Sequence, residues 1–146
     1  MSPLAEPLLP FVDEDSRPFF AAAARGELVV QRCTATGRLV FPPRALSPFA
    51  PRAPLAWAVV SGRGTIWSFV VPHPPLLPWF AELAPYVVLA VALDEDPRVR
   101  LVGNLVARAG GPIDEVDPGA ICIGARVRAC FERLGDEIAL PRWLLD

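Results

Sequence analysis

The chain has 146 residues, and its 14 basic and 16 acidic side chains give a formal net charge of −2. With 53% hydrophobic and 21% charged residues, the composition excludes a disordered chain, and the length predicts a single domain with at most a small appendage. All the basic residues are arginines. A slightly acidic chain of this kind is not suited to neutralising nucleic-acid phosphates, so we expect no nucleic-acid partner.

Cysteine usage and the apolar segments indicate the compartment. The three cysteines cannot all pair, and no two of them have the spacing of a thiolate metal clip. The proline-rich, acidic N-terminus lacks the basic start of a signal peptide. Four prolines interrupt the uncharged stretch 65–81, which excludes a membrane-spanning helix there. We therefore expect a cytoplasmic protein with reduced thiols and no membrane contact.

The N-terminal part predicts an arm and a short helix. Residues 1–15 are rich in proline and acidic residues and are expected to be extended. Ser16 is a candidate N-cap for a helix over 19–25. Gly26 then provides a helix stop, because glycine readily adopts the left-handed conformation found after helices.

Beyond the helix the sequence is typical of β structure, with strands expected over 28–31, 38–41, 55–71, 86–93, 99–106, 126–134 and 138–140. The two glycines in Ser61–Gly64 predict that 55–71 is one long strand with a bend, as at a barrel corner. Residues 72–85 predict a proline-rich crossing loop with one helical turn over 79–83. Pro141 is expected to end the last strand.

The pattern as a whole predicts a mainly β fold with a five-stranded OB-type barrel. In the strand over 99–106, Val99, Leu101 and Leu105 are expected on one face, with Arg100 and Asn104 on the other. A bent first strand followed by two hairpins suits the OB topology. The pattern alone also fits a small sandwich.

No set of residues has the spacing of a catalytic site. The single histidine, His73, lies between two prolines, and Asp94–Asp96 has the composition of a solvated turn. The chain has no lysine for a phosphate-binding P-loop, and Ser61–Gly64 does not match a nucleophile elbow. Cys122 and Cys130 are interpreted as small buried hydrophobic residues. We therefore expect no catalytic residues in this chain.

Cys33 lies at a place typical of a knuckle in a thiolate zinc site. A zinc ribbon would need a second cysteine at Thr36 and two more after the proline pair, where the sequence has Ser47 and Ala50. One ligand of four cannot hold a structural zinc ion. We therefore expect no metal ligands.

The order of several short motifs resembles that of the acyl-CoA-associated OB-fold family, long catalogued as a domain of unknown function. The matching segments are Phe19–Ala21, Gly26–Cys33, Gly37–Arg38, Phe41–Arg44, Ser61–Phe69, Pro85–Val88, Val99–Val106, Ile123–Val127, Phe131–Glu132 and Leu140–Trp143. The resemblance implies an arm and helix over 1–26, a degenerate, metal-free rubredoxin-like zinc-ribbon knuckle over 27–54, and an OB-fold domain over 55–146. The family's zinc ligands would fall at Cys33, Thr36, Ser47 and Ala50, so zinc is not carried over.

The resemblance further implies a non-catalytic accessory subunit. Members of the family bind thiolase-superfamily enzymes (thiolase, aldolase or acyltransferase) or MaoC-like enoyl-CoA hydratases, in hetero-oligomers that serve steroid side-chain degradation or polyketide acylation. The knuckle, the arm and the crossing loop with Trp79 and Phe80 are the expected docking surface. The alternatives are a single-stranded nucleic-acid-binding OB-fold and a stand-alone enzyme.

No tightly bound cofactor is expected, and a coenzyme A ester is the candidate ligand. Arginine forks and aromatic rings suit its phosphates and its adenine. The candidates for CoA contact are Arg44, Arg63, Trp67, Arg100 and Asn104.

Overall fold

The computed structural model describes residues 8–146, and residues 1–7 of the expected arm lie outside the described part. Helix α1 (Arg17–Ala24) begins directly after Ser16, as predicted. The Ser16 hydroxyl does not cap the helix but donates a hydrogen bond to Asp13 Oδ1 at 2.6 Å. Gly26 has a φ of +80° and turns the chain after the helix, which confirms its predicted role.

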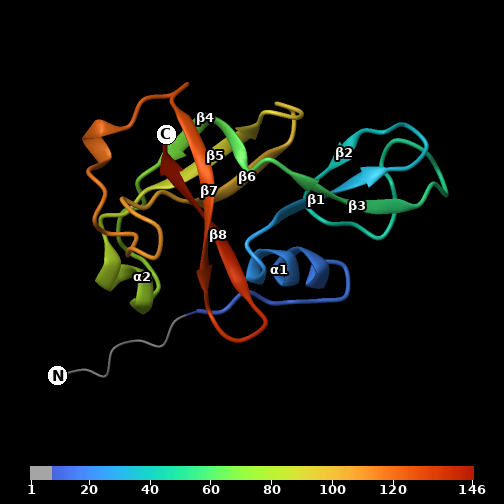
Figure 1. The fold of residues 1–146 in the computed structure, drawn as a ribbon. Coiled ribbons are helices and arrows are strands. Elements are labelled where there is room, and N and C mark those ends of the chain that lie inside the picture. The colour runs from blue at the N-terminus through green and yellow to red at the C-terminus, as the bar shows by residue number, and fades with distance from the viewer. Residues whose placement is uncertain (1–7) are drawn as a thin grey trace.

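A three-stranded antiparallel sheet follows α1 and forms the right-hand part of the molecule in Figure 1. Its strands are β1 (Leu28–Cys33), β2 (Leu39–Val40) and β3 (Leu55–Val60), in the order β2–β1–β3. The central strand β1 is buried except at Arg32. This burial is expected of an apolar, β-branched run between two neighbours.

A second sheet contains five antiparallel strands in the order β6–β5–β4–β7–β8 (Figure 1). These strands are β4 (Arg63–Val70), β5 (Val88–Leu93), β6 (Arg100–Asn104), β7 (Arg126–Arg133) and β8 (Ala139–Leu145). The edge strands approach each other at a bridge between Leu105 and Trp143, where the Val106 N–H donates to the Trp143 carbonyl at 2.9 Å. The mainly β prediction is confirmed, although the edges are joined by this bridge rather than by a continuous ladder.

Two strand predictions are wrong. The stretch 55–71 is not one bent barrel strand, because β3 pairs along its whole length with β1 and only β4 belongs to the second sheet. The chain therefore changes sheet at Ser61–Gly62, inside the expected OB domain of 55–146. Pro141 does not end the last strand, since β8 continues to Leu145 and pairs with β7 throughout. An edge strand tolerates a proline because its free side forms no ladder.

The loop between β4 and β5 contains α2 (Pro78–Leu83), which confirms the predicted helical turn. A short 3₁₀ helix spans Pro118–Ala120 in the loop between β6 and β7. The rings of Phe80 and Tyr86 lie 5.7 Å apart and belong to a second apolar cluster with Val106, Ile113 and Leu144. Phe80 thus helps to support the fold, and Trp79 is half-buried. The expected docking role of this loop stays a prediction. No helix among residues 8–146 is long and apolar enough to cross a bilayer.

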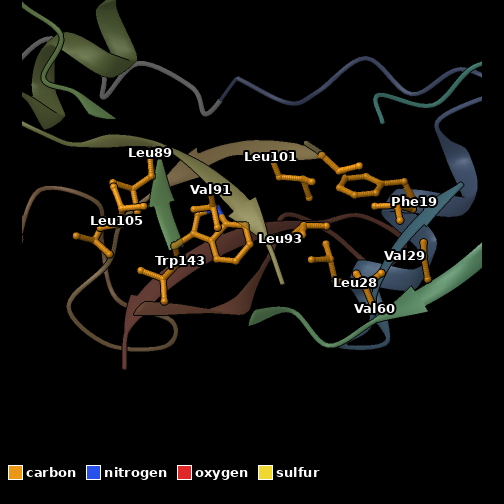
Figure 2. Close-up of a cluster of buried hydrophobic side chains, with 14 of the residues drawn as sticks. Phe19, Leu28, Val29, Val60, Leu89, Val91, Leu93, Leu101, Leu105 and Trp143 are labelled. Carbon is orange, nitrogen blue, oxygen red and sulfur yellow. The ribbon is translucent and has the colours of Figure 1, made fainter. Parts of the chain in front are cut away.

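The main core is continuous across both sheets, as Figure 2 shows. Phe19 of α1 and three residues of the first sheet, Leu28, Val29 and Val60, belong to it. From the second sheet and its edge it includes Leu89, Val91, Leu93, Leu101, Leu105 and Trp143. Trp143 has no exposed surface. A Cβ atom on Gly103 would lie 3.0 Å from Trp143 Nε1, so glycine at this position makes room for the indole ring.

A hydrogen-bonded group of Arg142, Glu132 and Asn104, called the clip below, lies where β6 approaches β8. Arg142 donates from Nε to Glu132 Oε2 at 2.8 Å and from Nη1 to Asn104 Oδ1 at 2.7 Å. Asn104 in turn donates to the Val87 carbonyl at 3.2 Å. Asn104 lies on the same side of β6 as Arg100, as predicted, but it is only 8% exposed because these hydrogen bonds cover it and satisfy its polar groups.

Replacing Arg142 by leucine is expected to lower the free energy of unfolding by about 2 kcal/mol, because the buried Asn104 oxygen loses its donor. Urea denaturation measures this change. Arg98→Leu is the matched control. Arg98 pairs with Asp96, but the Arg98 side chain is 69% exposed, and exposed ion pairs contribute less than about 1 kcal/mol to stability. Equal losses in the two variants would show that the clip has no special role.

Candidate functional site

The outward side of the second sheet carries exposed apolar side chains. Directly paired residues of neighbouring strands lie on the same face, so the register places Ser68, Ala90 and Val102 in one row across β4, β5 and β6. Val102 is 72% exposed, and Val70, two residues beyond Ser68, is 58% exposed. A shallow hollow of about 180 Å³ lies among these residues.

A β-bulge at Trp67 lies beside this row. The register between β4 and β5 shifts between Ile66 and Ser68, so Trp67 is the extra residue. Ile66 is buried while Trp67 is 52% exposed, as alternation along a strand predicts, and the bulge puts Ser68 on the same outward side. The Arg100 guanidinium carbon lies 3.6 Å from the Trp67 ring centroid, a cation–π contact. We call Trp67, Val70, Arg100 and Val102 the outer face.

Among the five candidates for CoA contact, Trp67 and Arg100 are brought into direct contact. Arg63 begins β4 and pairs with Asp146, with 3.1 Å between Nη1 and Oδ2. Arg44 lies in the loop between β2 and β3, where Gln31 holds its backbone. The polar groups of Asn104 bond to Arg142 and to the Val87 carbonyl. The structure therefore does not gather the five side chains into one pocket.

Val70 and Val102 belong to the outer face but are not among the site residues predicted from the sequence. The available signal was the alternation along β6, because Val102 lies between the inward positions Leu101 and Gly103. A hydrophobic residue at an outward position of a strand is informative only when others cluster beside it. The register of three strands supplies that clustering, and it is not visible in any single strand.

The histidine and the acidic residues that were not expected to be catalytic lie apart from one another or form ion pairs with arginines. His73 is exposed in the crossing loop. Asp94 accepts hydrogen bonds from Arg126 at 2.6 and 2.5 Å, and these bonds lower the pKa of the Asp94 carboxyl. Asp96 pairs with Arg98 in the same two-pronged way. Within the described residues, no three histidine, cysteine or acidic side chains form a group that could hold a metal ion.

The three cysteines have different surroundings. Cys122 is exposed, so the interpretation of it as a buried residue is wrong; it lies in the loop before β7 rather than in the strand. Cys130 is half-buried, and this burial raises the pKa of its thiol. Cys33, at the end of β1, has no exposed surface.

Cys33 is surrounded by hydrogen-bond donors. Hydrogen bonding from the side chains of Ser47 and Thr36, and from the backbone of Thr36 and Ala35, lowers the pKa of its thiol to about 7. Cys33, Thr36 and Ser47 are three of the four positions at which the resemblance places zinc ligands. The fold therefore brings these positions together although two of them carry hydroxyl groups.

Stability is expected to depend on pH through Cys33. Its pKa of about 7 in the folded chain lies below the ordinary value near 9. The thiolate therefore stabilises the fold fully above pH 9, and this contribution is lost as the pH falls through 7. Ultraviolet thiolate absorbance and urea denaturation across this range measure both effects.

The control for this titration removes the first donor. Ser47→Ala is expected to raise the Cys33 pKa and flatten the pH dependence, whereas Ser68→Ala, on the outward side of β4, is expected to change neither. An unchanged titration midpoint in Ser47→Ala would contradict the assignment.

A three-stranded ribbon followed by an OB-type sheet defines the class of two-part proteins that join a zinc-ribbon module to an OB-fold. Comparison with known families agrees with this class. The ChsH2 C-terminal OB-fold domain matches residues 57–132, and the ChsH2 rubredoxin-like zinc ribbon domain matches residues 20–46. The chain therefore belongs to the ChsH2 family, also known as DUF35, and the predicted resemblance is confirmed.

Its relatives are named as subunits or scaffolds. The chain is 34% identical over 136 residues to the 3-oxo-4,17-pregnadiene-20-carboxyl-CoA hydratase alpha subunit of Mycobacterium tuberculosis, covering 93% of this chain but 38% of that protein. It is 32% identical over 114 residues to a DUF35 domain-containing scaffold protein of Methanothermobacter thermautotrophicus, covering 77% of each. A solved structure described as an Ltp2-ChsH2(DUF35) aldolase matches with a TM-score of 0.78 and 32% identity, covering 94% of this chain and 98% of that chain.

The residues at the ribbon do not fit the zinc ion that the family's ribbon domain implies. A structural zinc site takes four ligands, normally cysteine thiolates and histidine nitrogens. Here one thiol, at Cys33, faces the hydroxyl groups of Thr36 and Ser47, and the fourth position, Ala50, offers only a methyl group.

Proposed function

We propose that this chain is a non-catalytic subunit of an acyl-CoA-processing complex and that it binds a thiolase-superfamily enzyme. The observation that carries this proposal is the outer face, where an exposed tryptophan, an arginine stacked on it and two exposed valines lie together. Contiguous exposed apolar groups mark interaction surfaces, and tryptophan and arginine are enriched where binding energy concentrates. The match over 94% of the chain to part of an Ltp2-ChsH2(DUF35) aldolase supports an aldolase as the partner.

The same face supplies groups suited to a CoA ester. The Trp67 ring offers an aromatic surface for adenine, and the guanidinium groups of Arg100 and Arg63 suit phosphate oxygens. We therefore place the CoA contact at these three residues, where the partner subunit would meet the sheet. Asn104 does not enter this proposal because its polar groups are already bonded within the chain, and Arg44 stays a separate prediction.

A MaoC-like enoyl-CoA hydratase is the alternative partner. Two relatives favour it by name: the hydratase alpha subunit of Mycobacterium tuberculosis and a probable enoyl-CoA hydratase alpha subunit of Thermomonospora curvata, which is 34% identical over 132 residues. This chain spans 38% of the length of each. The alternative therefore rests on proteins that are much longer than the matched part.

Co-expression with each candidate enzyme from the same genome tests the proposal. The tagged chain should co-elute in size-exclusion chromatography with a thiolase-superfamily subunit and should have no acyl-CoA turnover by itself. Co-elution with a MaoC-like subunit alone would favour the alternative. Elution by itself in the presence of both enzymes would refute the accessory-subunit proposal.

A further inference from the structure

We propose that the ribbon of this chain is held together by a hydrogen-bonded cross-link in place of a zinc ion. The link has two parts: a thiol hub at Cys33 and a side-chain clasp at Gln31. This inference concerns the ribbon alone and is independent of the proposed partner. It rests on the contacts between the two loops that a zinc ion would join.

The first loop is a tight turn closed by backbone hydrogen bonds around Cys33. The Gly37 N–H donates to the Cys33 carbonyl at 2.7 Å, and the Cys33 N–H donates to the Arg38 carbonyl at 2.8 Å. Backbone groups of Ala35 and Thr36 are directed at the Cys33 sulfur. The frame that would present a thiolate to a metal is therefore present, and hydrogen-bond donors surround the sulfur instead.

The second loop contacts the first through Ser47 and Phe49. Ser47 is the largest cause of the lowered pKa of Cys33, and the Ser47 oxygen accepts from the Phe49 N–H at 3.1 Å. The Arg38 guanidinium lies 3.8 Å from the centroid of the Phe49 ring, a cation–π contact. These contacts join the turn after β1 to residues 47–49, the same two loops that a four-ligand metal site would connect.

Gln31 makes the second part of the cross-link. Its amide nitrogen donates to the Arg44 carbonyl at 2.9 Å, and its amide oxygen accepts from the Arg44 N–H at 2.7 Å. The Gln31 side chain thus pairs with a backbone as another strand would, and it does so while only 5% exposed. Thr34 adds a further tie, because its hydroxyl and its N–H both donate to the Pro54 carbonyl. Both ends of the loop between β2 and β3 are therefore fixed by protein groups.

Metal analysis of the full-length chain tests the proposal directly. Protein purified from zinc-supplemented cells should contain far less than one zinc ion per chain, and its melting temperature should be the same in EDTA and in zinc chloride. Stoichiometric zinc, or a melting temperature that falls in EDTA, would overturn the proposal. Gln31→Leu should lower the melting temperature equally with and without EDTA, because the clasp does not involve a metal.

Restoring the missing ligands provides a second test. The variant Thr36→Cys/Ser47→Cys/Ala50→Cys should bind one Co²⁺ ion with the absorption spectrum of a tetrahedral thiolate site. The control that adds Cys33→Ser to these three changes should bind Co²⁺ much more weakly. A folded triple variant that binds no Co²⁺ would show that the four positions do not surround a metal-sized site, which overturns the proposal. If the triple variant does not fold, the zinc content of the wild-type chain still decides the question.

Discussion

Trp143→Ala is expected to lower the free energy of unfolding by about 4 kcal/mol, the largest loss of any single substitution considered. The side chain has no exposed surface and lies within the core that joins the two sheets. Its backbone also carries the bridge between the edge strands. Removing the indole opens a cavity whose walls come from several strands, so the surroundings cannot collapse to fill it. Urea denaturation monitored by circular dichroism measures the effect.

Two further variants separate the size of the ring from its polarity. Trp143→Phe should lose less stability than Trp143→Ala, because the ring remains and the indole Nε1, which has no hydrogen-bond partner within residues 8–146, is removed. Leu145→Ala, two residues along β8 and 46% exposed, should lose less than about 1 kcal/mol. A Trp143→Ala variant as stable as Leu145→Ala would contradict the placement of the indole in the core.

Trp67→Ala is expected to have the opposite effect: loss of assembly with little loss of stability. If the outer face binds the partner enzyme, removing its central aromatic side chain should weaken the complex by about 2 kcal/mol or more, roughly 30-fold in dissociation constant. The free energy of unfolding should change little, because the side chain is 52% exposed. Isothermal titration calorimetry with the purified partner measures the first effect, and urea denaturation measures the second.

The controls for this experiment test the extent of the outer face. Val102→Asp, which places a charge on the same face, should also disrupt the complex without unfolding the chain. Leu46→Asp alters an exposed residue of the ribbon loop (70% exposed) and should leave the affinity unchanged. If Leu46→Asp abolishes binding while Trp67→Ala and Val102→Asp do not, the partner binds at the ribbon and the outer face has another role.

Local patterns were sufficient to predict most elements but not the boundary between the sheets. The helix end at Gly26 and the inward positions Val99, Leu101 and Leu105 follow from turn chemistry and alternation, and the structure confirms them. The stretch 55–71 was misassigned because β3 and β4 are both apolar and only Ser61–Gly62 lies between them. Apolar and polar residues alternate with a period of two in any strand, whichever sheet it joins. The alternation in β3 therefore could not show that this strand pairs with β1.

The candidate site depended on contacts between distant residues. Asn104 lies on the face that the alternation predicts, yet hydrogen bonds to Val87 and Arg142, which lie 17 and 38 residues away in the sequence, leave it buried. Trp67 is a candidate for its chemistry, but the bulge that puts Ser68 beside it on the outward side arises from the pairing of β4 with β5. Arg100 was selected separately, and only the register of three strands places it on the Trp67 ring. Residue types suggested the chemistry, and tertiary structure decided which groups meet.

The continuous core has a consequence for how the molecule comes apart. Leu28, Val29 and Val60 of the ribbon sheet share one apolar cluster with the strands of the OB sheet and with Phe19. Neither sheet can open without uncovering the other, so calorimetry should record one cooperative transition rather than a separate melting of the ribbon. The ribbon therefore depends on its neighbour as well as on its own internal contacts, and an excised fragment of residues 8–60 would lack the OB-sheet side chains that complete its core.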